Sequence, residues 1–142
     1  MSSAPVLVVA FGGRIFGLDP ASGQHRWMRE MARTGQTQVI RLALDGERVY
    51  AAIWRDLTCL DAATGAVLWQ TNVEDACSNL LVADGRVHAA GGGKMRSFNA
   101  ATGALLWEDD FAGFGGGDVA LALVGGDAPL ALAGVTSQAD RG

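Results

Sequence analysis

The residues of this chain that could do chemistry are scattered along it rather than clustered. Its two cysteines, Cys59 and Cys77, match no zinc-ligand spacing and are too few for a disulfide framework. Its two histidines, His25 and His88, fall in different segments, and no Ser-His-Asp arrangement can be assembled around them. We expect the histidines on strands, packed or facing solvent, and the cysteines simply half-buried in strands. These residues therefore predict neither a catalytic centre nor a metal site.

Two short motifs resemble ligand sites without completing one. The pair Asp109-Asp110 could contribute to a calcium site, but calcium prefers six to eight oxygen ligands and this stretch offers no dense oxygen-rich loop. The run Gly91-Gly92-Gly93-Lys94 lacks the flanking pattern and the following helix of a phosphate-binding loop. We interpret this run as a wide hairpin turn.

Composition excludes several classes of partner. Of the 142 residues, 49% are hydrophobic and 18% are charged, which is enough apolar material to bury a core. The net charge of −4, without any run of like charges, argues against binding to nucleic acid or to a membrane surface. The apolar run 6–11 has no positively charged flank and ends at Gly12, so it is too short for a signal peptide or a membrane span. We therefore expect a soluble, cytoplasmic protein.

The elements that must position these residues are set by an internal repeat. Residues 17–27, 59–69 and 97–107 align without gaps. Their period of about 40 residues, with strand-length apolar runs, is typical of β-propeller blades. The shared motif positions are Asp19, Gly23 and Trp27 in the first copy; Asp61, Thr64, Gly65 and Trp69 in the second; and Asn99, Thr102, Gly103 and Trp107 in the third.

Each motif residue has a local structural role that its chemistry predicts. The Asp61 carboxylate can accept hydrogen bonds from backbone N–H groups of the following turn, and Thr64 can do so more weakly. Gly65 supplies the positive φ that lets the third strand of a blade reverse into the fourth. Trp69 then presents a flat surface that can cover the apolar face of a neighbouring blade.

A second repeated element precedes each motif and completes the blade. The Asp-Gly pairs at 45–46 and 84–85 lie between apolar runs and predict tight hairpins. With innermost strands expected at 39–44, 79–83 and 119–124, the sequence predicts an all-β fold, a partial β-propeller of four-stranded antiparallel blades. We expect one domain over 1–142, with repeats at about 5–36, 37–75 and 76–113, a partial repeat at 114–134 and a tail at 135–142.

The segment Leu60-Asp61-Ala62-Ala63-Thr64-Gly65, followed by Trp69, resembles the PQQ-like propeller repeat. The resemblance extends from about residue 6 to about residue 134, with mild departures at Pro20, Ser22 and Asn99. That family includes quinoprotein alcohol dehydrogenases and an outer-membrane assembly lipoprotein. A quinoprotein would need adjacent cysteines, a calcium site and a catalytic carboxylate, whereas Cys59 and Cys77 lie in different repeats. We therefore expect no cofactor and no enzymatic activity.

The number of repeats raises the question of closure. Single-chain propellers use about four to eight blades, and an open arc would expose strand edges. The first repeat has no innermost strand, and the last has one and then a second strand at 130–133. We expect a head-to-tail homodimer of about six to seven blades, in which the C-terminal innermost strand completes the partner's first blade. The alternatives are a fragment of a longer propeller and an arc completed by a different chain.

The loops that join fourth to first strands and second to third strands should share one face. We expect the chain to act as a non-catalytic scaffold or protein-recognition module through this face, because exposed aromatics beside arginine are typical of interfaces. One alternative is that these residues cap the channel or pack between blades; another is a propeller that binds a small molecule or quinone. The candidate residues are Arg29, Arg33, Trp54, Arg55, Asp56, Lys94, Phe111 and Phe114.

Overall fold

Three antiparallel sheets make up the described part of the chain. The structure is a computed structural model and describes residues 5–31, 40–53, 55–73, 79–113 and 121–122. These residues form eleven strands and include no helix long and apolar enough to cross a membrane. The sheets are β1 (Leu7–Phe11), β2 (Arg14–Leu18) and β3 (His25–Glu30); β4 (Ile40–Asp45), β5 (Arg48–Ile53), β6 (Asp56–Asp61) and β7 (Val67–Asn72); and β8 (Asn79–Ala83), β9 (Arg86–Gly91), β10 (Lys94–Asn99) and β11 (Leu105–Asp109).

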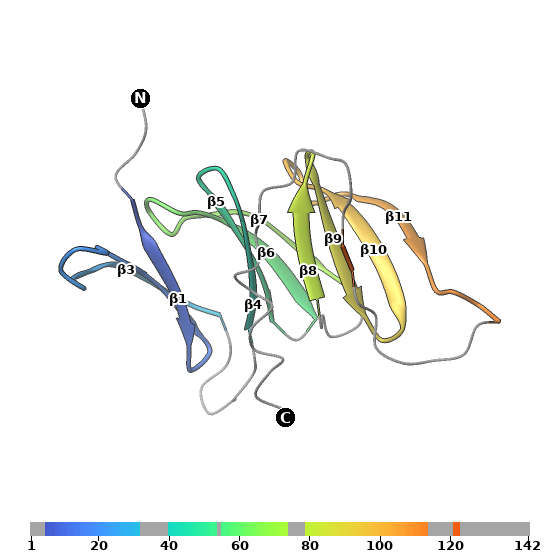
Figure 1. Ribbon diagram of the computed structural model, residues 1–142, viewed down its shortest axis with the longest axis horizontal. Coiled ribbons are helices and arrows are strands. Elements are labelled where there is room, and N and C mark those ends of the chain that lie inside the picture. The colour runs from blue at the N-terminus through green and yellow to red at the C-terminus, as the bar shows by residue number, and fades with distance from the viewer. Residues whose placement is uncertain (1–4, 32–39, 54, 74–78, 114–120, 123–142) are drawn as a thin grey trace.

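The sheets are successive blades of a propeller-like arc. Each is an up-and-down meander in which strands consecutive in sequence are neighbours, and the three sheets follow one another across the molecule (Figure 1). The first strands of the second and third sheets, β4 and β8, contact each other, while β7 and β11 lie at the opposite edges of those sheets. This arrangement confirms the all-β propeller-type fold, and within the described residues the first sheet has three strands, as predicted. Closure by a second chain stays a prediction.

Two-residue turns set the register of the hairpins. Ala83 pairs with Arg86, which leaves Asp84 and Gly85 as the turn, and both have positive φ (54° and 76°). This is the backbone of a type I′ turn, which the Asp-Gly pair favours because both residues tolerate that region. The predicted wide hairpin at Gly91-Gly92-Gly93-Lys94 is wrong in its width. Gly91 pairs with Lys94, so Gly92 and Gly93 form a tight turn of the same kind.

The core lies between the blades rather than within any one of them. One buried cluster joins the second and third sheets and includes Tyr50, Val82 and Phe98. A smaller cluster, which includes Ile15 and Leu60, joins the first and second sheets. The middle sheet is therefore covered on both faces, and β5 is buried along nearly all of its length. This explains why its sequence is continuously apolar rather than alternating.

Several predictions lie outside the described residues. They include most of the partial fourth repeat at 114–134, with its expected strands, and the tail at 135–142. The repeat boundaries therefore stay predictions. The same is true of four individual residues, namely Arg33, Trp54, Cys77 and Phe114.

Candidate interaction site

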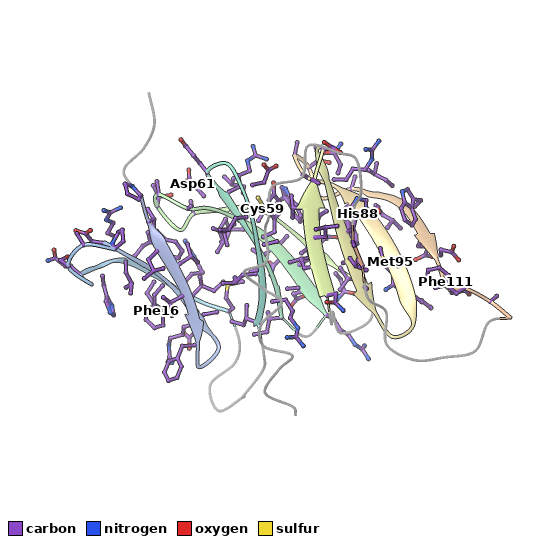
Figure 2. All side chains as sticks on the ribbon, viewed as in Figure 1. Phe16, Cys59, Asp61, His88, Met95 and Phe111 are labelled. Carbon is purple, nitrogen blue, oxygen red and sulfur yellow. The ribbon has the colours of Figure 1, made fainter. Side chains whose placement is uncertain are left out.

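The motif turns are built as their residue types predict. In the second blade the Asp61 carboxylate accepts a hydrogen bond from the Ala63 N–H at 2.8 Å, and the Thr64 hydroxyl accepts one from the Ala66 N–H at 3.2 Å. Gly65, with φ of +77°, donates its N–H to the Asp61 carbonyl at 2.7 Å. Figure 2 shows Asp61 at the end of β6, where the chain reverses into β7. The predicted local roles of these motif residues are confirmed.

The first tryptophan docks on the turn of the next blade. The Trp27 indole Nε1–H donates to the Ala62 carbonyl at 2.8 Å. Its ring lies so close to Gly65 that a Cβ there would come within 2.5 Å of ring carbon Cε3. Gly65 is therefore required twice, by its positive φ and by the tryptophan above it. Arg29 adds to this contact, because its Nε donates to the Gly65 carbonyl at 3.0 Å. We call such a contact, in which a tryptophan of one blade covers the motif turn of the next, a joint.

Trp69 makes the same kind of contact between the second and third blades, where more donors meet one carbonyl. Trp69 Nε1 donates to the Ala100 carbonyl at 2.9 Å, and a Cβ on Gly103 would lie 2.6 Å from the Trp69 ring. The Arg48 guanidinium and the Tyr50 hydroxyl also point their donors at the Ala100 carbonyl, at 3.4 Å and 3.5 Å. Sequence reasoning missed this convergence. Tyr50 and His88 each lie nine residues before the corresponding motif positions, Cys59 and Ser97, and this spacing could have drawn attention to the convergence.

The third tryptophan has no such partner among the described residues. Trp107 is 46% exposed, and its neighbours Leu105 and Leu106 are 52% and 47% exposed. A cavity of about 440 Å³ beside it is lined by Arg86, His88 and Leu106, among others. The outer surface formed by Arg86, His88, Leu106 and Trp107 is called the end face below.

The structure describes part of the predicted loop face. We define it as the ends of the sheets that carry the β1–β2, β5–β6 and β9–β10 turns, together with the described residues that follow β3, β7 and β11, namely Met31, Val73 and 110–113. Two backbone hydrogen bonds of 2.8 Å tie these parts together, from the Met31 N–H to the Gly13 carbonyl and from the Val73 N–H to the Arg55 carbonyl. Asp56 and Lys94 begin β6 and β10 at this face. Arg29, in contrast, lies inside β3 and uses its Nε in the joint with the second blade.

Phe111 is exposed on the loop face, and the acidic pair that precedes it fixes its backbone. The Asp109 carboxylate accepts the Phe111 N–H at 2.8 Å, and the Asp110 carboxylate accepts the Ala112 N–H at 3.1 Å. These bonds fix a turn in which Phe111 has a φ of +52° and is 38% exposed. Figure 2 shows the residue beyond the end of the last strand. A bulky residue in the left-handed region is uncommon, and such positions concentrate at functional sites.

The titratable residues singled out from the sequence lie apart. His25 is in the first sheet, where its ring contacts Phe16 edge-on at 5.4 Å between centroids, and His88 is in the third. Cys59 is completely buried, and burial raises the pKa of its thiol, which makes it a poor nucleophile. Burial, reinforced by the Arg86 charge, lowers the pKa of His88. No group of three potential metal ligands occurs within the described residues.

Comparison with known proteins places this architecture in a family. The family model described as outer membrane protein assembly factor BamB matches residues 12–129. The chain belongs to this BamB family of PQQ-like repeat propellers. The predicted resemblance is therefore confirmed. A comparison with curated protein sequences finds no significant match.

Solved structures with the same fold include both assembly factors and enzymes. BamB from Moraxella catarrhalis aligns with a TM-score of 0.62 and 23% identity, over 74% of this chain and 34% of that one. A quinohemoprotein alcohol dehydrogenase from Pseudomonas putida aligns with a TM-score of 0.58 and 18% identity, over 75% and 19%. Sqt1 from Saccharomyces cerevisiae aligns with a TM-score of 0.63 and 15% identity, over 72% of this chain and 30% of that one. This BamB-family chain spans about a third or less of each neighbour, and the likeness shows the fold alone.

Proposed function

We propose that this chain is a non-catalytic scaffold that binds a polypeptide partner through its loop face. The observation that carries the proposal is the turn that holds Phe111 exposed with a φ of +52°. Two carboxylates, those of Asp109 and Asp110, accept backbone N–H groups and fix this turn. A residue whose backbone is already fixed before binding loses less conformational entropy on contact, which favours Phe111 as an interface anchor.

The surroundings of the loop face suit a polypeptide rather than a nucleic acid. Charges of both signs begin the neighbouring strands, with Asp56 on β6 and Lys94 on β10. A second exposed aromatic, Phe11, is 74% exposed at the β1–β2 turn of the same face. Apolar anchors with a mixed-charge rim are the usual composition of a protein interface. Membership of a family named for an outer membrane protein assembly factor supports the same function.

Quinone binding is the second candidate, favoured by the dehydrogenases among the structural neighbours. A titration of the chain with pyrroloquinoline quinone and calcium separates the two functions. The scaffold proposal expects no saturable change in quinone absorbance. A saturable change in quinone absorbance would favour cofactor binding instead.

The scaffold proposal is tested with a random peptide library as the probe. Peptides are selected on the wild-type chain, and the Kd of each enriched peptide is measured by calorimetry for wild type and for Phe111→Asn. Asparagine tolerates the left-handed backbone, so this variant removes the ring and keeps the turn. We expect the Kd to rise at least about 30-fold, the loss typical of a removed anchor residue.

A matched control separates loss of the anchor from general loss of exposed apolar surface. Val67, on β7, is 45% exposed at the end of its sheet that carries the motif turn rather than the loop face. Val67→Ser should leave peptide affinity within about twofold of wild type. Enriched peptides that bind wild type and Phe111→Asn equally would contradict the proposed site, and a chain that enriches no peptide would contradict the function.

A further inference from the structure

The two contacts between blades have the same geometry, and among the described residues one half of such a joint lies without its counterpart in the first sheet and the other half in the third. In both internal joints a tryptophan covers a buried motif glycine and donates its indole N–H to a carbonyl of the same turn. The exposed Trp107 is the unused tryptophan half. Gly23 is the unused turn half, because no atom of the described residues lies within 4 Å of the position its Cβ would occupy.

The unused turn is already in its docked form. Gly23 has a φ of +78° and donates its N–H to the Asp19 carbonyl at 2.7 Å, as Gly65 and Gly103 do in their own turns. The Asp19 carboxylate accepts the Ala21 N–H at 3.0 Å, which lowers the pKa of Asp19 and keeps it charged. By position in the motif, the Pro20 carbonyl corresponds to those of Ala62 and Ala100. The turn therefore needs no rearrangement before it accepts a tryptophan.

Pro20 itself fits a blade that lacks an inner hairpin. In the other two motif turns the residue at this position donates its N–H to an inner hairpin, from Ala62 to Glu47 and from Ala100 to Gly85. Proline has no N–H to satisfy. The described part of the first sheet contains no strand before β1 that could supply such a hairpin.

The end face reproduces the donor side of an occupied joint. Trp107, Ser97 and His88 occupy the same cross-strand row as Trp69, Cys59 and Tyr50. The rings of His88 and Trp107 lie 6.2 Å apart at 44°, against 6.0 Å and 47° for Tyr50 and Trp69. The arrangement of side chains that converges on the Ala100 carbonyl in the second joint is thus already present at the end face, where no described residue supplies an acceptor carbonyl.

The hydrogen-bond donors of the end face also match those of the joint between the second and third blades. Ser97 hydrogen-bonds Nδ1 of His88, so a neutral His88 that accepts there carries its proton on Nε2. His88 can then donate to a carbonyl as the Tyr50 hydroxyl does, and Arg86 takes the place of Arg48. The cavity of about 440 Å³ between Arg86, His88 and Trp107 is the space that a motif turn would occupy.

We infer that the end face receives the Asp19–Gly23 turn of a second copy of this chain. Trp107 of one copy covers Gly23 of the other and donates to its Pro20 carbonyl, with Arg86 and His88 directed at the same oxygen. The contact is head-to-tail, so two copies related by a two-fold axis make it twice and close a ring of about six blades. This inference does not rest on the loop face, and it gives the predicted self-assembly a specific joint.

Sedimentation of the full chain and of two matched glycine variants tests the joint. Wild type should sediment as a dimer of twice 14.7 kDa. Gly23→Ala places a methyl where Trp107 must lie and should raise the dimer Kd at least about 30-fold. Gly46→Ala adds the same methyl at a φ of +62° in open space, so it imposes similar backbone strain and should leave the Kd within about threefold. Trp107→Ala should weaken the dimer as Gly23→Ala does.

A mixing experiment shows whether the joint is head-to-tail. Gly23→Ala retains a sound Trp107, and Trp107→Ala retains a sound turn, so an equimolar mixture can form one intact joint that neither variant forms alone. The mixture should therefore contain a heterodimer at concentrations where each variant is monomeric. A monomeric wild type, an unaffected Gly23→Ala dimer, a mixture without heterodimer, or a trimer or filament would each overturn the inference. Circular dichroism of each variant at these concentrations establishes that it is folded.

Discussion

At the scale of single residues, the motif glycines show that the turn conformation is encoded locally, whereas the burial of the turn is not. Gly23, Gly65 and Gly103 have φ values between +77° and +83° and the same backbone hydrogen bond to the first residue of the turn. Gly65 and Gly103 are buried under tryptophans, while Gly23 is exposed. The turn therefore forms from its own four or five residues, and only its neighbour decides whether it is buried.

A methyl group at Gly65 should be far more costly than one at an open glycine. Gly65→Ala adds a clash with Trp27 to the strain of a positive φ, and we expect a loss of about 3 kcal/mol in the free energy of unfolding. Gly46→Ala carries the strain alone and should lose about 1 kcal/mol. Urea denaturation measures both. Equal losses would mean that Trp27 does not hold the joint as described.

Two buried hydroxyls of similar size should respond in opposite directions when removed. The Thr58 hydroxyl in β6 has no hydrogen-bond partner among the described residues, whereas that of Ser97 in β10 bonds His88. Thr58→Val should raise the free energy of unfolding by about 1 kcal/mol, and Ser97→Ala should lower it by about 1 kcal/mol. The comparison uses urea denaturation at pH 7.5, and a loss in Thr58→Val would indicate a partner for its hydroxyl.

The protonation of His88 should make stability fall on mild acidification. Burial and the Arg86 charge lower the pKa of His88 in the folded state, against a smaller opposing effect of Asp84. The unfolded chain then binds the proton more readily, so stability declines as pH drops below about 6.5 and levels off below the folded pKa. His88→Gln should reduce the difference in melting temperature between pH 7.5 and pH 5.5. An unchanged difference would place the pH sensitivity elsewhere.

At the scale of strands and turns, the sequence was informative because the signals are short-range. The Asp-Gly pair at 84–85 predicts its hairpin from two residues, and the innermost strand expected at 79–83 is observed as β8. The carboxylate of Asp61 bonds a backbone group only two residues away. Each of these features depends on chain neighbours alone, so periodicity and turn chemistry are sufficient to predict them.

Contacts between blades could not be predicted in the same way. Trp69 meets the Ala100 carbonyl across 31 residues, and Arg29 meets that of Gly65 across 36. The tryptophan was expected to cover a neighbouring blade, but its exact acceptor depends on how the sheets are rotated against each other. Arg29 was assigned to the loop face because the strand end was placed too early. The pairing of Arg14 with Glu30 extends β3 past it.

At the scale of the whole molecule, the arc presents two complementary ends. Its interior joints are occupied on both sides, while the end face and the Asp19–Gly23 turn are preformed and have no partner turn or tryptophan among the described residues. Two copies joined head-to-tail would satisfy these ends and keep the loop faces together on one side of the ring. The proposed scaffold function then gains two copies of the Phe111 anchor, which favours partners with repeated binding segments.

The most direct test follows the indole N–H groups of ¹⁵N-tryptophan-labelled protein by NMR during dilution, with resonances assigned through single Trp→Phe variants. Trp27 and Trp69 donate within one chain, so their indole shifts should not depend on concentration. Trp107 donates only across the inferred joint, so its indole resonance should move to a solvent-exposed position as the dimer dissociates. A Trp107 resonance that stays unchanged from millimolar to micromolar protein would contradict the account.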